Sequence, residues 1–92
     1  MVAIARALVG NVQLLLMDEP FEGLSPVMIK DLFECINRLR SKVSIMIIEH
    51  QLDLVLALTD RTYVLDRGII SHDGPARPLL EDLDLRKEKL WV

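Results

Sequence analysis

The chain has 92 residues, of which 51% are hydrophobic, and a formal net charge of −3 at pH 7. This length allows one domain at most, and the acidic balance excludes a general electrostatic attraction to nucleic acid or anionic lipid. The lone cysteine, Cys35, excludes an internal disulfide and the usual zinc spacings, which fits a reducing compartment. No apolar run approaches the roughly 20 residues that a membrane-spanning helix needs.

The first half of the chain predicts a helix, a strand, a second helix and a second strand. A small-residue helix over 1–8 stops near a Gly-Asn pair, and a buried strand follows at 12–17. Ser25 is a suitable N-cap for a helix over 26–40. Its apolar stripe is formed by Ile29, Leu32, Phe33, Ile36 and Leu39. The run VSIMII at 43–48 is typical of a strand covered on both faces, so a right-handed βαβ unit is predicted.

The second half predicts a short helix, a hairpin and a helical tail. After a helix over 52–58, strands at 62–65 and 69–72 are joined by Asp66-Arg67-Gly68, with the glycine supplying the turn. The charged tail over 76–92 is predicted to be helical. Its short apolar docking stripe comprises Leu79, Leu80 and Leu83, and Leu90 with Trp91 forms a terminal apolar pair. The predicted fold class is α/β, as one domain over 1–92 with a body at 1–75.

Two strand ends carry the residues suited to chemistry. Asp18 and Glu19 follow the apolar run at 14–17, and Glu49-His50 follows the VSIMII strand. If the two strands are parallel, both pairs leave the same edge of the sheet, where ligands bind in α/β proteins. Phosphoryl transfer needs a carboxylate to hold Mg²⁺ and a group that polarises the attacking water. A histidine in that crevice can hydrogen-bond a terminal phosphate.

Each of these residues also has a purely structural interpretation. A strand that ends in two acids can simply be leaving the core, and His50 alone is typical of a helix N-terminus or a loop. Their expected convergence at one edge favours the functional interpretation. Cys35 is expected to pack on the margin of a helix, and His72, in the hairpin, is expected to be a surface residue.

Five motifs together resemble a known family. They are ARAL at 5–8, LLLMDEP at 14–20, EGLSP at 22–26, IIEH at 47–50 and DRTYVLDRG at 60–68. In order and spacing they resemble the second half of an ABC-transporter ATPase subunit. Within that family, the stretch is most similar to the ATPases of importers for branched-chain amino acids and urea.

The resemblance implies a partial P-loop NTPase sheet, built from a Walker B strand and a switch strand. It implies that Asp18 holds Mg²⁺, that Glu19 is the base that polarises water, and that His50 is the switch histidine that contacts the γ-phosphate. The D-loop, which contacts a second ATPase subunit, would comprise Glu22, Gly23, Leu24 and Ser25. Many relatives have aspartate in place of Ser25, and Phe21 replaces a small residue, which puts loop packing near Glu19 in question.

The resemblance also implies a setting for the whole subunit. Mg-ATP hydrolysis would drive uptake of amino acids or a similar small solute. The subunit would be cytoplasmic, peripheral to the inner membrane, and would pair with a second ATPase subunit and with transmembrane permease subunits. No nucleic-acid partner is expected.

Two family motifs are absent from these residues. A phosphate-binding loop reads GxxxxGK[ST], and no Gly-Lys pair occurs, nor does LSGGQ. The expectation is that the chain begins inside a longer reading frame, binds no Mg-ATP alone and self-associates through uncovered strands.

Alternatives from other classes stay open beside this one. The first is a non-catalytic remnant or interaction module that pairs with a complete ATPase subunit. A receiver-like domain with Asp18 as phosphoacceptor is disfavoured, because it needs an earlier acidic cluster and a later strand-end lysine. A DExD-type helicase is disfavoured by Pro20 and by IIEH.

Overall fold

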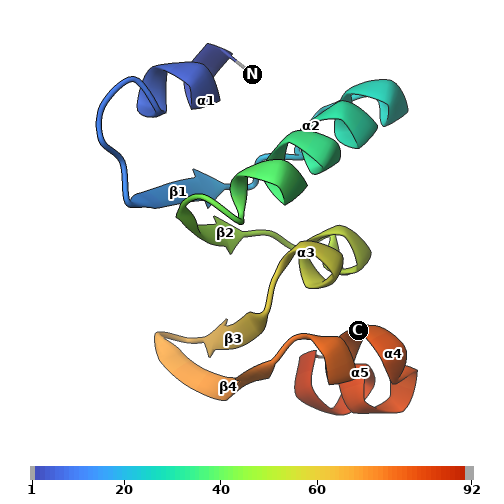
Figure 1. The fold of residues 1–92 in the computed structure, drawn as a ribbon. Coiled ribbons are helices and arrows are strands. Elements are labelled where there is room, and N and C mark those ends of the chain that lie inside the picture. Colours follow the sequence, from blue (N-terminus) through green and yellow to red (C-terminus); the bar gives the residue numbers. More distant parts are fainter. Residues whose placement is uncertain (1, 91–92) are drawn as a thin grey trace. The chain divides into compact units, whose positions relative to one another are not determined.

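Two parallel strands joined by a helix form the first part of the fold. The computed structural model describes residues 2–90, and the chain divides into two units after Gln51. The first unit contains α1 (Val2–Ala7), β1 (Leu14–Asp18), α2 (Pro26–Leu39) and β2 (Ser44–Ile48) (Figure 1). β1 and β2 pair in parallel, from Leu14 opposite Ser44 to Asp18 opposite Ile48. The predicted strand, helix and parallel strand are therefore confirmed.

The two faces of this strand pair differ in burial. On one face Leu15 and Met17 are buried. Successive side chains of a strand point to opposite faces, so the alternate positions share the other face. The exposed apolar side chains of that face are Leu14, Leu16, Met46 and Ile48. The prediction that the VSIMII strand is covered on both faces is wrong for the described residues. An apolar strand sequence shows that both faces can be buried, but it does not show whether another element packs on each face.

Helix α2 begins with the predicted cap. The Ser25 hydroxyl accepts a hydrogen bond from the Met28 N–H at 3.3 Å, and Pro26 occupies the first turn. Within the predicted stripe, Leu32 and Ile36 are buried and the other members are half-buried, as is Cys35. At 14 residues α2 is the longest described helix, and none of the described helices has the length and apolar character to cross a bilayer.

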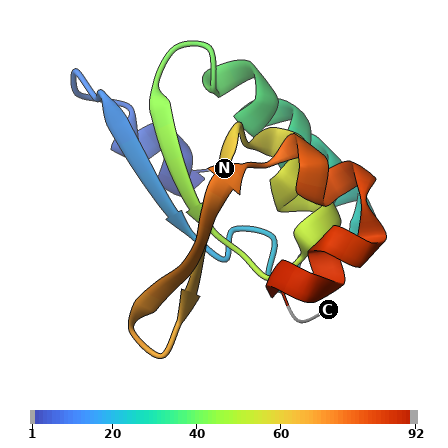
Figure 2. The same cartoon turned by 90° about the horizontal axis from the view of Figure 1, so that it is seen from below.

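The second unit consists of a hairpin with three short helices. Its elements are α3 (Leu52–Leu58), β3 (Arg61–Asp66), β4 (Ile69–Pro75), α4 (Arg77–Glu81) and α5 (Leu83–Leu90). β3 and β4 pair antiparallel, and their turn points away from α4 and α5 (Figures 1 and 2). The core of this unit is formed by Leu56, Ala76 and Leu79, against which Leu52, Val55, Leu80 and Leu85 pack.

A two-residue turn closes the hairpin. Arg67 and Gly68 have φ values of 51° and 79°, so both adopt the left-handed conformation of a type I′ turn. A bulge then interrupts the pairing, because Val64 lies opposite His72 whereas the next residue, Leu65, lies opposite Ile70. At the open end of the hairpin, the ion pair with Asp73, at 2.7 Å, raises the pKa of Arg61.

His72 is not the surface residue that the sequence predicted. It is half-buried, and its Nε2 is buried without a hydrogen-bond partner among the described residues. The ring lies against Gly74, where an added Cβ would meet Nε2 at 3.4 Å. Because Gly74 has no side chain, the imidazole of His72 can pack against its backbone.

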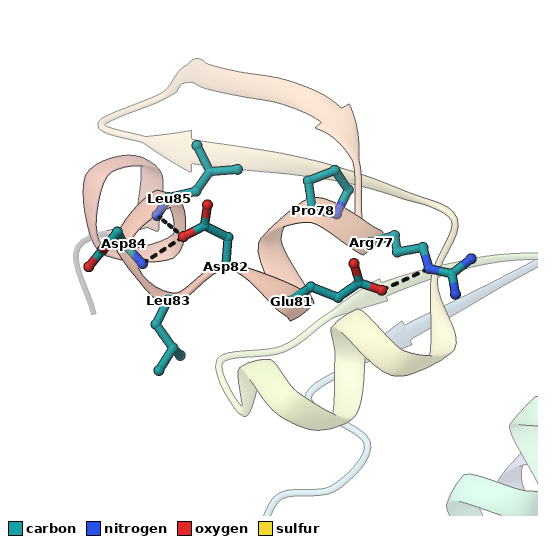
Figure 3. A pocket seen from close by; sticks show the side chains of 7 residues that line it. All are labelled: Arg77, Pro78, Glu81, Asp82, Leu83, Asp84 and Leu85. Carbon is teal, nitrogen blue, oxygen red and sulfur yellow. Dashed lines mark hydrogen bonds and ion pairs between the residues drawn. The ribbon is translucent and has the colours of Figure 1, made fainter.

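The helical tail is confirmed over 77–90, as two helices with Asp82 between them. The Asp82 Oδ1 accepts hydrogen bonds from the N–H groups of Asp84 and Leu85, at 3.0 and 3.1 Å, and so caps α5 (Figure 3). Leu79 is buried but Leu83 is 63% exposed, so the three leucines do not form one docking stripe. Trp91, of the predicted terminal apolar pair, lies outside the described residues.

Candidate functional site

The carboxyl ends of β1 and β2 lie side by side. Asp18 is opposite Ile48, and the Glu19 N–H donates a hydrogen bond to the Ile48 carbonyl at 2.7 Å. The two segments that follow the strands therefore leave from the same edge. The expected convergence of Asp18-Glu19 with Glu49-His50 is observed.

Glu19 and His50 are in direct contact. The His50 Nδ1 lies 2.9 Å from the Glu19 Oε1. An ionised carboxylate only accepts hydrogen bonds, so Nδ1 carries the proton in this pair. The His50 Nε2 lies 3.8 Å from the Glu22 Oε2, and the His50 side chain is 66% exposed. The pair is thus accessible to a ligand that arrives from solvent.

Glu19 lies in the tight turn that connects β1 to α2. Glu19 has a φ of 47°, in the left-handed region that a residue with a side chain rarely adopts. Its carbonyl accepts a hydrogen bond from the Glu22 N–H at 3.1 Å. Gly23 follows with a φ of 72°, and the hydroxyl of Ser25 is used in the helix cap. Helix capping therefore accounts for Ser25 without a role in chemistry.

Asp18 lies apart from the Glu19–His50 pair. Its side chain is exposed and forms no hydrogen bond or ion pair with the described residues. It is one of the residues that line an apolar hollow of about 530 Å³ along α1, β1 and α2. An exposed, unpaired carboxylate at a strand end is an oxygen ligand of the kind that Mg²⁺ prefers.

The close cluster at this edge is formed by Glu19, Glu22 and His50. One ligand atom from each lies within 4.8 Å of the others, and all three residues are exposed. Two carboxylates and an imidazole can hold a divalent cation or share protons with a bound ligand. The structure thus brings Glu22, Glu19 and His50 together, whereas Asp18 belongs to no such cluster among the described residues.

Glu49 is the member of the site that the sequence analysis left without a role. Its side chain is fully buried, at 0% exposure. The Oε2 accepts a hydrogen bond from the Phe21 N–H at 3.3 Å, and the Oε1 accepts one from the His50 N–H at 3.0 Å. The sequence contained a signal for this role, because Glu49 directly follows an apolar strand, and a carboxylate that is buried there needs hydrogen-bond donors. Phe21, the bulky departure from the family pattern, is buried.

A second hollow lies in the other unit and lacks these features. It measures about 790 Å³ and is lined by residues of α4, α5 and the turn between them (Figure 3). Three of its charged residues already have partners, because Arg77 pairs with Glu81 at 2.9 Å and Asp82 caps α5. The ends of β1 and β2 remain the candidate functional site.

Comparison with known proteins gives three informative relatives. No protein-family model matches the chain. It is 45% identical over 78 residues to the high-affinity branched-chain amino acid transport ATP-binding protein BraG of Pseudomonas aeruginosa. That match covers 83% of this chain and 34% of BraG. It is 38% identical over 80 residues to the probable branched-chain amino acid transport ATP-binding protein LivG of Archaeoglobus fulgidus, covering 86% of this chain and 31% of LivG.

The third relative belongs to an export system. Over 87 residues the chain is 33% identical to the lipopolysaccharide export system ATP-binding protein LptB of Escherichia coli, covering 94% of this chain and 36% of LptB. A solved structure of an ATP-binding cassette of an ABC transporter, in its ADP conformation, matches with a TM-score of 0.75 and 35% identity. That match covers 94% of this chain and 36% of the cassette.

The chain spans about a third of the length of the relatives it matches. Its α/β fold, with a parallel strand pair and an antiparallel hairpin, matches the cassette over nearly all of that span. The chain is a homologue of part of the ATP-binding subunits of ABC transporters.

Proposed function

We propose that this chain forms the hydrolytic side of a Mg-ATP site in the ATP-binding subunit of an ABC importer. The observation that supports this most is the contact of Glu19 with His50 at the ends of two parallel strands. The names of BraG and LivG specify branched-chain amino acid transport. Uptake of amino acids or a similar small solute is therefore the proposed task of the whole transporter.

The donor set fits the cation of such a site. Asp18 offers carboxylate oxygens that are exposed and unpaired among the described residues, as a Mg²⁺ ligand requires. A bound Mg²⁺ would supply positive charge that neutralises the phosphate oxygens. We assign Asp18 to this ion.

Glu19 and His50 would divide the remaining work. The Glu19 Oε1 accepts the His50 Nδ1–H, so its second oxygen remains able to accept a proton from water. The His50 Nε2 can donate to a phosphate oxygen when the imidazole is protonated. Glu19 is thus the proposed base, and His50 the proposed sensor of the terminal phosphate.

The partners follow from the same proposal. The turn over 22–25, in which Glu22, Gly23 and Ser25 are exposed, would contact a second ATPase subunit, and permease subunits would hold the pair at the inner membrane. The complete subunit would work in the cytoplasm. The 92 residues contain no GxxxxGK[ST] motif, so we expect the phosphate-binding loop to come from outside them and the isolated chain to bind Mg-ATP weakly.

A non-catalytic interaction module is the second candidate. The exposed apolar face of β1 and β2 favours it, because such a face can pair with another copy or with a complete subunit. Under this alternative Asp18, Glu19 and His50 would be relics without activity.

Reconstitution with the remaining part of a relative separates the two candidates. The chain is mixed with the segment of BraG that precedes the matched stretch, and ATP hydrolysis is measured. We expect Mg²⁺-dependent turnover that Glu19→Gln lowers by about 10²- to 10⁴-fold, the usual contribution of a positioned base. Glu34→Gln, which changes an exposed acid on α2, is the matched control and should leave turnover unchanged.

The isolated chain provides the counter-test. Calorimetry of the chain alone should detect no micromolar affinity for Mg-ATP. A micromolar affinity abolished by Asp18→Asn would show that the phosphate-binding loop is not needed. Equal turnover of the Glu19→Gln and wild-type mixtures would instead remove Glu19 as the base, as the non-catalytic module predicts.

A further inference from the structure

Glu49 joins two loops that are distant in sequence. It follows β2 directly, and its fully buried carboxylate accepts a hydrogen bond from the Phe21 N–H, 28 residues away. The other oxygen accepts from the His50 N–H at 3.0 Å and from the Gln51 N–H at 3.4 Å. One side chain therefore holds the backbone of the turn after β1 and of the turn after β2.

A buried carboxylate is suited to this task. An ionised carboxylate is costly to bury unless hydrogen-bond donors surround it, and bonds to a charged acceptor are stronger than those to a neutral one. Its two oxygens only accept, and the groups that face them are all N–H donors. A neutral amide in the same place would turn an N–H donor toward one of these donors.

The loop that Glu49 holds carries the strained residue of the site. Glu19 lies two residues before Phe21 and has a φ of 47°. Such a conformation persists only where the surrounding structure holds it. Here the bond from the Glu19 N–H to the Ile48 carbonyl holds one side, and the bond from the Phe21 N–H to Glu49 holds the other.

We propose that Glu49 is the positioning residue that brings Glu19 and His50 into contact by fixing the two turns. Its carboxylate bonds to the backbone beside both residues and its Oε1 lies 3.7 Å from the His50 Nδ1, whereas Glu19 and His50 are the groups exposed to a ligand. The meaning of this contact for catalysis rests on the proposed function. The contact itself is measurable without ATP.

The test uses nuclear magnetic resonance on the 92-residue chain with ¹⁵N-labelled histidine side chains. In the wild type, His50 should show the pattern of an Nδ1-protonated ring, whereas a solvated imidazole favours the other tautomer. In Glu49→Gln we expect His50 to lose that pattern. His72, the second histidine of the chain, belongs to the hairpin and is the internal reference.

Amide hydrogen exchange reports the backbone side of the proposal. Loss of one bond to a charged acceptor should speed exchange of the Phe21 amide by about tenfold or more. The Ser44 amide bonds to the Gln13 carbonyl at the far end of the strand pair and should exchange unchanged. Glu34→Gln again serves as control and should move neither signal.

A second variant covers the case in which Glu49→Gln does not fold. Glu49→Asp keeps the charge and can reach the adjacent N–H groups, but it is one methylene shorter and should lose only the bond to Phe21. We expect faster Phe21 exchange, an altered His50 pattern and unchanged Ser44 exchange. Unchanged His50 and Phe21 signals, or equal acceleration of Phe21 and Ser44, would overturn the proposal.

Failure of this proposal and failure of the proposed function are distinguishable. If Glu49 variants separate Glu19 from His50 while Glu19→Gln leaves reconstituted turnover unchanged, the positioning role stands and the catalytic assignment falls. If turnover depends on Glu19 but Glu49 variants leave the His50 pattern intact, the reverse holds.

Discussion

Arg86 is a single residue that the structure uses in an unexpected way. Its side chain is only 11% exposed. The guanidinium donates to the carbonyls of Leu79 and Leu80, at 3.0 and 3.1 Å, and to the Asp53 carboxylate at 2.9 Å. Carbonyls at the end of a helix lack partners within it, so a cation there satisfies them and complements the helix dipole. Arg86 thereby ties α5 to α4 and α3.

Replacing Arg86 by Met keeps most of the volume and removes every hydrogen bond. The orphaned Leu79 carbonyl is buried and that of Leu80 is partly buried, so each costs free energy, and we expect the free energy of unfolding to fall by about 2 to 3 kcal/mol. Urea denaturation followed by circular dichroism measures this loss. Lys87→Met changes the exposed neighbour on α5 and should lower stability by less than about 0.5 kcal/mol. If Arg86→Met and Lys87→Met lowered the free energy of unfolding equally, the loss would be due to the removed charge and not to the hydrogen bonds of Arg86.

At the scale of the element, the hairpin is formed by a turn that is not optimal. Type I′ turns need two left-handed residues and favour Asn-Gly or Asp-Gly. The chain has Arg67-Gly68 there, with Arg67 at a φ of 51° and its side chain exposed. For most residues with a side chain the left-handed conformation costs roughly 1 to 2 kcal/mol of free energy, and for asparagine it costs less. Strand pairing therefore sustains strain at Arg67.

Arg67→Asn should relieve part of that strain. We expect the free energy of unfolding to rise by about 0.5 to 1 kcal/mol, since asparagine adopts the left-handed region more easily. Arg67→Lys retains both the charge and the conformational cost, and it should leave stability unchanged. Thermal unfolding of the three proteins decides the matter, and a Lys variant as stable as the Asn variant would refute the turn explanation.

At the scale of the whole molecule, exposed large hydrophobic side chains gather in two places, apart from scattered ones such as Val27 and Leu83. One is the face of β1 and β2, and the other is the hairpin, where Tyr63, Leu65, Ile69 and Ile70 are more than half exposed. Soluble monomers rarely expose large contiguous apolar areas. Such surfaces fit a chain that matches a third of its relatives' length. We expect the isolated chain to self-associate.

The face of β1 and β2 offers a direct test of this expectation. Leu16 and Met46 lie opposite one another and are 67% and 54% exposed. The double variant Leu16→Lys, Met46→Lys places like charges on this face, so its mass by light scattering should fall below that of the wild type, with the hairpin surface left as it is. Val27→Lys changes an exposed apolar residue on α2 and should leave association as it is. A monodisperse wild-type monomer at all concentrations would contradict the prediction.

By itself, the sequence determined the elements and the two strand ends that form the candidate site. Caps, turns and apolar periodicity act over a few residues, so Ser25, Gly68 and the stripe of α2 could be identified locally. The motifs likewise identified the family, because they are strings of adjacent residues. The catalytic roles of Asp18, Glu19 and His50 stay predictions.

Only the tertiary structure decided which side chains meet. The contact of Glu19 with His50 and the burial of Glu49 depend on atoms about 30 residues apart along the chain. The half-burial of His72 and the exposure of one face of β2 likewise depend on what packs against them. Local pattern cannot specify such partners, because burial and hydrogen bonding are properties of the folded neighbourhood and not of the residue.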